Sequence, residues 1–493
     1  MKNLLFILFA TFGAFSAFSQ TQTVGVFNNT EDSFDGYTLY APIPGFNTFL
    51  INNCGEVVNE WSSEYRIGLS AYLLEDGSLL RTGLLPSPAE HPFSGGGTGG
   101  RVEIISWDGD LLWFINWADE EKHHHHDIEI LPNGNILLIS WEGHSYEEAI
   151  SMGKDSTATE NPLWCCQIVE IEPTGSEGGN VVWSWSAWDH MVQDSDPSKP
   201  NYGVVSENPR KFNINFTNGN GPNQGAGASD WMHCNSVDYN DDLDQIMISS
   251  AKFCEFWIID HSLSTEEAAT EAGDLLYRWG NPEAYDRGNS SDQKLFHQHD
   301  AHWMDEGIMV FNNGKNRPDG EYSTVEIFEL PQMSNGTYPI EPGQTFMPTN
   351  YSWRYPAEFD PEFYSQNISG ASRLPNGNTL ICEGGSGHLG RPLRSPVRPR
   401  VGAQGISGLS TLVSGSYIGM DPGPAGGPEV HKFVGLEEPP IDISGKNGLS
   451  LTLVRRDLGG LEDGSPIFYR GIVVGEVVEY DLNREKNQVE IHV

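Results

Sequence analysis

The chain has 493 residues and a formal net charge of −40 at pH 7, from 68 acidic and 28 basic side chains. Repulsion from so much negative charge is long-ranged, which argues against nucleic acid or an anionic membrane surface as a partner for the bulk of the protein. With 55 glycines, 30 prolines and no long amphipathic helical run, the composition favours many short strands joined by turns.

The N-terminus has the pattern of a secretory signal peptide. Lys2 precedes an apolar run that extends through Phe18, and small residues stand before Gln20. The run is too short to span a membrane comfortably, so cleavage after Ser19 is predicted. We expect a signal peptide at residues 1–19 and a soluble mature protein that is periplasmic or secreted. Six cysteines could oxidise there, but their spacing predicts no particular disulfide.

From residue 36 to about 385, two kinds of segment alternate. One is a strand pair whose second strand carries tryptophan or tyrosine, at 48–61, 102–117, 168–185, 257–279 and 325–355. The other is a hairpin, mostly with an Asn-Gly or Asp-Gly type of turn, at 72–82, 127–141, 235–250, 301–312 and 372–383. This repeat predicts an all-β fold, a six-bladed β-propeller of four-stranded blades. No outer strand pair follows Glu383, so the last blade is predicted to be incomplete.

The residue types suggest different roles for the two kinds of segment. We expect the tryptophans of the outer strands to fill the wedges between neighbouring blades rather than to bind a ligand. The first strands of the hairpins should line the central channel, and His126, His233 and His299 open three of them at equivalent places. Strand alternation puts Asn235 on the same face as His233. The residues alone leave two readings open: a shared reactive site, or strand-end histidines that bond to the backbone.

Four consecutive histidines, 123–126, invite a metal interpretation. Their internal position argues against an affinity tag, and alternation along a strand would aim only two of the four inward. A zinc site built from His126, His233 and His299 has suitable ligands, but no local ligand spacing supports it. We therefore expect neither a metal nor another cofactor.

Several longer stretches of the sequence together resemble one known protein family. They include His125-His126-Asp127, Asp230-Trp231-Met232-His233-Cys234-Asn235-Ser236, Ile258-Ile259-Asp260-His261-Ser262, Gln298-His299 and Phe311-Asn312-Asn313-Gly314. Together, residues 36–385 resemble the aryl-sulfate sulfotransferase family, exported six-bladed propellers that move a sulfuryl group from an aryl sulfate to a phenol without a nucleotide donor.

The resemblance implies roles for particular residues. His299 would be the nucleophile that becomes a transient sulfohistidine, with His126, His233 and Asn235 binding the sulfuryl oxygens, stabilising charge or moving the phenolic proton. The family also carries a channel arginine after a Ser-Ser pair, where this chain has Ala251.

Other side chains are candidates to replace that arginine. Lys252 follows directly but should face the other side of the strand unless a bulge turns it. Arg317 and Arg373 lie near other inner strands, and Ser369 stands where the family carries a hydroxyl residue. Losing a bidentate cation from an anion site would cost on the order of 2–3 kcal/mol.

The C-terminal residues carry a second resemblance. The stretches are Val397-Arg398-Pro399-Arg400-Val401, Gly435-Leu436-Glu437-Glu438-Pro439-Pro440, Leu449-Ser450-Leu451-Thr452-Leu453 and Gly464-Ser465-Pro466-Ile467-Phe468-Tyr469-Arg470-Gly471-Ile472. They resemble the end of one MCE domain and the start of the next in a paraquat-inducible B-type lipid-transport protein, which implies partial β-barrels of a kind that assembles into lipid-conducting rings. The join at residues 386–397 interrupts both resemblances mid-domain, which favours an abrupt junction of two coding segments over an evolved bifunctional protein.

The resulting domain expectation has four parts. Residues 1–19 are the signal peptide, 20–388 the propeller, 389–445 a partial MCE-like segment and 446–493 the start of a second one. The predicted function is sulfuryl transfer between an aryl sulfate and a phenol. The alternatives are a non-catalytic, ligand-binding propeller and a lipid-transport component that acts through the tail with lipid or other MCE-type subunits.

Overall fold

The computed structural model describes residues 32–43, 45–86, 92–156, 161–217, 229–331 and 336–385, together with the backbone of short strands at 388–389 and between 452 and 492. The chain divides into two compact units, one holding the strands up to residue 389 and the other those from residue 452 onward. The predicted signal peptide and almost all of the predicted segment 389–445 lie outside the described residues.

Antiparallel sheets dominate the first unit. Four sheets of four strands and two of three strands follow one another along the chain. Their strands are β1 (Tyr37–Tyr40), β2 (Asn47–Asn52) and β3 (Val57–Ser62); β4 (Arg66–Leu73), β5 (Leu79–Leu84), β6 (Gly100–Ile105) and β7 (Leu111–Asn116); β8 (Lys122–Ile130), β9 (Ile136–His144), β10 (Leu163–Pro173) and β11 (Gly179–Ser186); β14 (Cys234–Asn240), β15 (Gln245–Ser250), β16 (Glu255–Asp260) and β17 (Tyr277–Trp279); β18 (His299–Met304), β19 (Gly307–Asn312), β20 (Thr324–Phe328) and β21 (Trp353–Tyr355); and β22 (Gly370–Arg373), β23 (Thr379–Glu383) and β24 (His388–Leu389).

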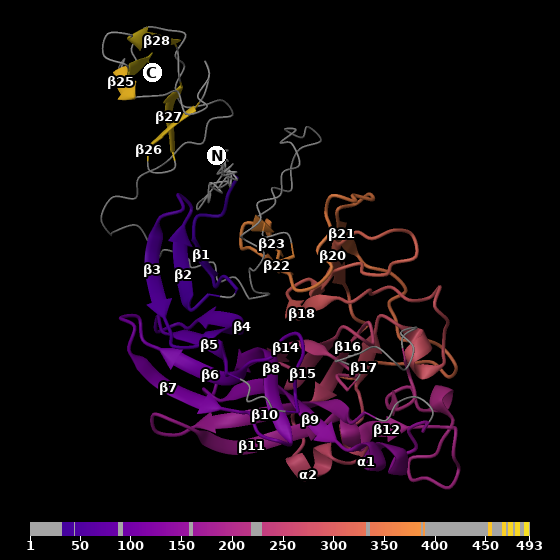
Figure 1. Cartoon of the computed structure of the whole chain (residues 1–493). Coiled ribbons are helices and arrows are strands. Elements are labelled where there is room, and N and C mark those ends of the chain that lie inside the picture. The colour runs from indigo at the N-terminus through magenta and orange to yellow at the C-terminus, as the bar shows by residue number, and fades with distance from the viewer. Residues whose placement is uncertain are drawn as a thin grey trace, which may run out of the picture. The chain divides into compact units, whose positions relative to one another are not determined.

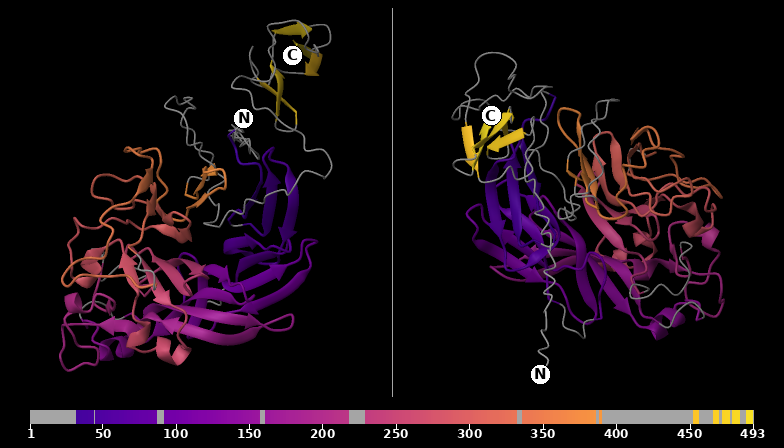
Figure 2. Two further views of the ribbon diagram at one scale, coloured as in Figure 1. Left: turned by 180° about the vertical axis from the view of Figure 1, so that it is seen from behind. Right: turned by 45° about the horizontal axis from the view of Figure 1, so that its top comes forward.

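The sheets are the blades of a β-propeller. The first strands of successive sheets contact one another in the order β4, β8, β14, β18 and β22, and the sheets succeed one another in chain order from indigo to orange (Figures 1 and 2). The predicted all-β propeller is therefore confirmed. Among the described residues, four of its blades have four strands, and the first and last sheets have three each.

The hairpin turns form where glycine can take a positive φ. Gly77, Gly134 and Gly377 have φ of 85°, 86° and 83°. In each turn the glycine N–H donates to the carbonyl three residues earlier, as Gly134 does to Leu131 at 2.9 Å. Because a side chain is strained in this conformation, the Asn-Gly and Asp-Gly pairs fix where each inner hairpin reverses.

Tryptophans on the outer strands join neighbouring blades. The indole N–H groups of Trp61, Trp113, Trp183 and Trp279 each donate to a backbone carbonyl beyond their own sheet, at 2.6–2.9 Å. All four rings are at most 5% exposed. The wedge-filling role predicted for these tryptophans is confirmed.

The two ends of the ring meet through a small contact. Asn378 Nδ2 donates to the carbonyl of Asp32 at 2.6 Å, and Asn376 Nδ2 to the same oxygen at 3.2 Å. Tyr40 of β1 packs against the buried Cys382 of β23. The described residues contain no disulfide bond.

Short elements occupy the loops between blades. Helices α1 (Tyr146–Ser151) and α2 (Thr265–Ala268) each begin at a capping box, with Ser145 and Ser264 as the N-caps. A parallel strand pair, β12 (Met191–Val192) and β13 (Phe212–Asn213), lies between β11 and β14 in the chain. None of the described helices is long and apolar enough to cross a membrane.

The second unit contains five short strands. The strands β25 (Thr452–Arg455), β29 (Gln488–His492) and β28 (Glu479–Asn483) form one sheet in that order, and β26 (Pro466–Tyr469) pairs with β27 (Ile472–Glu476). All of these pairings are antiparallel. The strands agree with the β-rich tail predicted from the sequence.

Candidate active site

Bulges near the starts of inner strands set the directions of the three predicted histidines. The pairing registers of β8, β14 and β18 with their partners shift close to His126, His233 and His299. His126 and His233 have φ of 58° and 50°, in the left-handed region that side chains seldom occupy. Because a bulge re-aims the side chains around it, strand alternation does not decide where these histidines point.

The three histidines come together. The rings of His126 and His233 lie 4.7 Å apart between centroids and nearly perpendicular, at 84°. Burial lowers the pKa of His126 well below its usual value, and the nearby His233 and His299 lower it further. Three different blades therefore contribute imidazoles to one cluster, in which His126 and His299 are buried and His233 is partly exposed.

The tautomer of His299 follows from its neighbour Asn313. The Nδ2 group of Asn313 donates to the carbonyls of Ser365 at 2.8 Å and Ile368 at 2.7 Å, so its Oδ1 must be the atom 2.8 Å from His299 Nδ1. Nδ1 therefore carries the proton, and it also lies 3.1 Å from the carbonyl of His297. The lone pair remains on Nε2, where the Ile368 N–H donates to it at 3.2 Å.

The environment of His299 keeps its ring neutral. The residue is only 3% exposed. Burial lowers its pKa to about 4, and the opposing effect of the Asn313 hydrogen bond does not restore it. At neutral pH, Nε2 is thus an unprotonated nitrogen with an available electron pair, which is what a nucleophile requires.

His233 is held by a carboxylate. Its Nδ1 forms a short hydrogen bond with Oδ2 of Asp230. The other carboxylate oxygen, Oδ1, accepts from the Trp141 indole N–H at 2.9 Å. Burial alone would raise the pKa of Asp230, but His233 and Lys252 lower it to about 2. An ionised carboxylate on Nδ1 leaves Nε2 as the exchangeable nitrogen, so the pair can move a proton.

A glycine segment that sequence reasoning missed packs on these rings. A Cβ on Gly97 would lie 1.9 Å from His126 Cε1, and one on Gly96 would lie 3.5 Å from His233 Cε1. Gly97 has φ of 83°, and its carbonyl accepts from the His126 N–H at 2.7 Å. The run Ser94-Gly95-Gly96-Gly97 was the available signal, since backbone can approach a ring closely only where Cβ is absent.

Two lysines lie near the histidine cluster. Strand β15 ends at Ser250, so Lys252 belongs to the following turn, and the expectation that it faces away does not hold. Its Nζ donates to the carbonyl of Asp230 at 2.6 Å. Lys315 was not predicted; together with burial it lowers the pKa of His297 to about 3, and it also interacts with His299. The turn after β19 therefore carries both Asn313 and a cation into the site.

The predicted arginines lie elsewhere. Arg317 stacks over Tyr322, with its guanidinium carbon 4.3 Å from the ring centroid, and lines a separate cavity. Arg373 stands at the turn end of its hairpin, where it bonds Thr379 at 2.5 Å and pairs with Glu306 at 3.5 Å. The histidines lie at the end of the inner hairpins opposite to Arg373. Arg317, in the turn after β19, contacts Tyr322 and Thr324 instead of the three histidines.

Asn235 and Ser369 lie close to the histidine-bearing segments. Asn235 Nδ2 donates to the carbonyl of Gln298 at 2.7 Å, next to His299, while its buried Oδ1 has no hydrogen-bond partner. Ser369 donates to Ser365 Oγ at 2.7 Å and follows Ile368, whose N–H contacts His299. Both residues lie at the edge of the site, and these hydrogen bonds do not involve the imidazole of His299.

Carboxylates that follow the histidine motifs hold the inner strands together. Asp127 Oδ2 accepts from the Val237 N–H at 3.2 Å, and Asp300 Oδ2 accepts from the Ala371 N–H at 2.8 Å. Burial raises the pKa of Asp127 to about 7. These hydrogen bonds cross from one blade to the next and leave the preceding histidines free for other contacts.

All four consecutive histidines are buried. The His124 Nδ1 accepts from the Gly100 N–H at 3.2 Å, and His125 stacks on Trp141 with centroids 4.2 Å apart. The bulge in β8 breaks the alternation on which the prediction relied. In the described part of the chain, no group of three or more His, Cys, Asp or Glu residues is arranged to hold a metal ion.

Comparisons with known families match two parts of the chain. A family model described as arylsulfotransferase (ASST) matches residues 115–401, more than half of the sequence. A second model, described as MlaD protein, matches residues 447–493.

Curated relatives match a short stretch. The "Lipophilic envelope-spanning tunnel protein B" of Escherichia coli is 41% identical over 97 residues, and the "Probable intermembrane transport protein" of Haemophilus influenzae is 37% identical over 97 residues. In each case the match covers 20% of this chain and 11% of the relative. The chain thus spans about a tenth of the length of these relatives.

Solved structures with some likeness cover much of the chain at low scores. A protein of unknown function from Bacteroides caccae shares 13% identity over 71% of this chain and 83% of that one, with a TM-score of 0.38. The periplasmic gluconolactonase PpgL of Pseudomonas aeruginosa shares 11% identity over 73% and 95%, with a TM-score of 0.33. Scores this low support no conclusion about function.

Proposed function

Because the chain belongs to the arylsulfotransferase family, we propose that it moves a sulfuryl group from an aryl sulfate to a phenolic acceptor through a covalent intermediate on His299, without a nucleotide donor. Family membership supports a sulfotransferase-type function in general. The observation that carries the finer proposal is the cluster of three imidazoles from three blades, one of them the buried His299 with its Nε2 lone pair assigned by Asn313.

In the donor step, His299 Nε2 attacks the sulfur atom. A nitrogen–sulfur bond forms, the sulfur–oxygen bond to the aryl group breaks, and the aryl oxide leaves with the electron pair of that bond. The Nδ1 proton stays on the ring, where Asn313 Oδ1 stabilises the positive charge that develops. The hydrogen bond from the Ile368 N–H to Nε2 must break first, so the segment around Ile368 moves during the reaction.

Proton transfer is assigned to His233. Protonated on Nε2 at the start, it gives that proton to the leaving aryl oxide and takes one from the phenolic acceptor in the second step. The acceptor oxygen then forms the new bond to sulfur, and the electron pair of the nitrogen–sulfur bond returns to His299. The Asp230 carboxylate stabilises the charged form of His233 and fixes its ring.

The sulfuryl oxygens require cations or hydrogen-bond donors. Lys252 and Lys315 both act electrostatically on His297, which precedes the nucleophile by two residues. We assign to them the charge that the family's arginine supplies. A lysine offers a point charge instead of a planar fork, so the oxygens would be held with less directional restraint than by an arginine.

The cellular and domain assignments belong to the same proposal. The predicted signal peptide supports export to the periplasm or the exterior, where small aryl sulfates and phenols are the partners. We keep 20–388 as the sulfotransferase-like domain, with 389–445 and 446–493 as MCE-like segments.

The test is a transfer assay with 4-nitrophenyl sulfate and a phenol acceptor. The full chain should release 4-nitrophenol, sulfate the acceptor and carry an acid-labile adduct on His299. His299→Ala should abolish all three, whereas His144→Asn, which changes a histidine stacked on Trp188 away from the cluster, should not. Transfer that survives in a folded His299→Ala protein would overturn the assignment of the nucleophile. No transfer by the wild type would favour the alternative of a ligand-binding propeller.

The tail carries a second candidate function. Residues 447–493 match the MlaD model, and the E. coli relative is named for a lipophilic tunnel. We propose that the tail contacts lipid or other MCE-type subunits. Lipid extracted from the purified full chain, compared with a chain that ends at residue 388, tests this; equal lipid content in the two would exclude it.

A further inference from the structure

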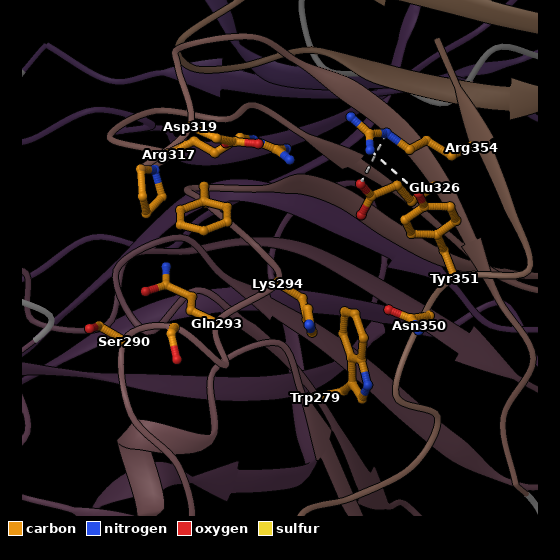
Figure 3. Close-up of a pocket in the computed structure, with 13 residues that line it drawn as sticks. Trp279, Ser290, Gln293, Lys294, Arg317, Asp319, Glu326, Asn350, Tyr351 and Arg354 are labelled. Carbon is orange, nitrogen blue, oxygen red and sulfur yellow. Dashed lines mark hydrogen bonds and ion pairs between the residues drawn. The ribbon is translucent and has the colours of Figure 1, made fainter. Parts of the chain in front are cut away.

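A cavity of about 390 Å³ lies in the propeller, apart from the histidine cluster. Its walls come from two blades: Trp279 ends β17, while Glu326 and Arg354 belong to β20 and β21. Arg317, from the turn after β19, and Lys294, from the segment before His299, complete the basic side chains (Figure 3). The cavity is on the side of the ring at which β18 begins, because β19 ends and β20 begins there.

The positive groups of the cavity have unused donors. Arg317 donates to Thr324 Oγ1 at 3.2 Å, but its Nε is buried without a hydrogen-bond partner. The buried Nε of Arg354 also lacks a hydrogen-bond partner, and Glu326 Oε1 is 4.0 Å away. The heads of Arg317 and Arg354 lie toward each other along one side of the cavity (Figure 3). Two buried guanidinium donors without acceptors are costly unless a ligand supplies the acceptors.

The acidic side chains are already occupied. Asp319 accepts from the Tyr322 hydroxyl at 3.0 Å. Glu326 accepts from Thr324 Oγ1 at 2.8 Å and from Asn312 Nδ2 at 3.3 Å. Three basic residues face two acids, one of which pairs with Arg354, so the lining keeps an excess of one positive charge that favours an anion.

Aromatic side chains line the remaining part of the cavity. Trp279 and Phe296 are only 5% and 8% exposed, so Tyr351, which is 41% exposed, offers the most accessible of these rings. Trp279 lies beside Lys294, across the cavity from Arg317 (Figure 3). Flat apolar walls select a planar ring, and fork-shaped guanidinium groups select planar or tetrahedral oxyanions.

We propose that this cavity is a second binding site, for a small aromatic anion that carries a sulfate, sulfonate or carboxylate group on its ring. The site is distinct from the histidine cluster and performs no bond cleavage. It adjoins that cluster along the chain, since Arg317 and Asn313 share one turn and the Gly314 N–H donates to the Phe296 carbonyl at 2.9 Å.

Titration calorimetry of the full chain with 2-naphthalenesulfonate tests the proposal. The carbon–sulfur bond of this probe cannot donate a sulfuryl group, so the result does not depend on catalysis. We expect binding with a stoichiometry of about one in Lys252→Gln, in which the histidine cluster has lost a cation. Neutral 2-naphthol should bind at least about tenfold more weakly, because it offers the guanidinium donors no anion.

Charge-removing variants locate the site. Lys294→Gln alters an exposed side chain and should keep the fold, and both it and Arg354→Gln should weaken binding at least about tenfold. The matched control is Arg66→Gln, an exposed arginine that lies over Phe46 on the first blades. Equal weakening by the control, binding that disappears in Lys252→Gln but persists in Lys294→Gln, or no binding at all would each overturn the proposal.

Discussion

Lowering the pH from 7 to 5 should leave the donor half-reaction almost unchanged, because burial lowers the pKa of His299 to about 4. A nucleophilic imidazole loses activity when it is protonated. The depressed pKa means that the ring stays neutral well below the range in which an ordinary histidine becomes charged. The acid limb of the rate profile therefore reports the environment of this one side chain.

The size of the effect follows from the two pKa values. At pH 5 a group with a pKa of about 4 is roughly 90% neutral, whereas a group with the usual value of about 6.5 is only about 3% neutral. The rate of phenol release at pH 5 should thus be about 30 times higher than an unperturbed histidine would allow.

The assay is a pH jump followed by a single turnover. Protein held at pH 7 is mixed with 4-nitrophenyl sulfate in buffers from pH 4 to 7, stopped after short intervals and read as 4-nitrophenolate in alkali. Circular dichroism on the same timescale confirms that the chain remains folded. A rate that falls about tenfold for each pH unit below 6.5 would refute the assignment of His299 as a buried, neutral nucleophile.

Three further predictions concern the fold around the site. Arg278 and Glu255 form a fully buried ion pair, so Arg278→Met and Glu255→Leu should each lower the free energy of unfolding by about 3–5 kcal/mol. The double variant should lose clearly less than the sum of the two, and additive losses in urea unfolding would contradict this. Gly97→Ala should lower the melting temperature and remove transfer activity, since its methyl group would overlap the His126 ring; unchanged melting and turnover would show that the glycine segment does not press on that ring. Stability should decrease as the pH falls from 6.5 to 5, by on the order of 1 kcal/mol per unit, because histidines of the unfolded chain bind protons in this range while His124, His297 and His299 stay neutral in the fold. The raised pKa of Asp127 offsets part of this loss, and urea midpoints independent of pH in this window would exclude the prediction.

The sequence was sufficient to predict the repeat. The turn glycines and the tryptophans of the outer strands recur with a regular spacing, and both depend on local chemistry: a positive φ in the turn and a large apolar ring between blades. The same periodicity placed His126, His233 and His299 at equivalent strand ends. Their convergence in space follows from the ring, which required no knowledge of individual contacts.

The details of the site were beyond this kind of reasoning. Bulges and left-handed residues such as His126 leave no reliable local signal, so strand alternation alone did not give the directions of the four-histidine run. Asn313 could have been found from the hairpin register, because pairing of His299 with Phe311 places Asn313 opposite His297. The hairpin was predicted to end at Ser250, as β15 does, but strand alternation was extended to Lys252, which belongs to the following turn, and a turn does not alternate its faces.

The burial of the four-histidine run has a practical consequence for handling the protein. His123, His124, His125 and His126 are 1%, 0%, 0% and 3% exposed. A run of imidazoles normally adheres to immobilised nickel, since neutral imidazole is a strong ligand for that metal. The intact blade keeps these four rings away from the resin, whereas an unfolded chain presents them all. Passage of untagged protein over a nickel column should therefore separate folded molecules, which this run does not retain, from unfolded ones, which it does.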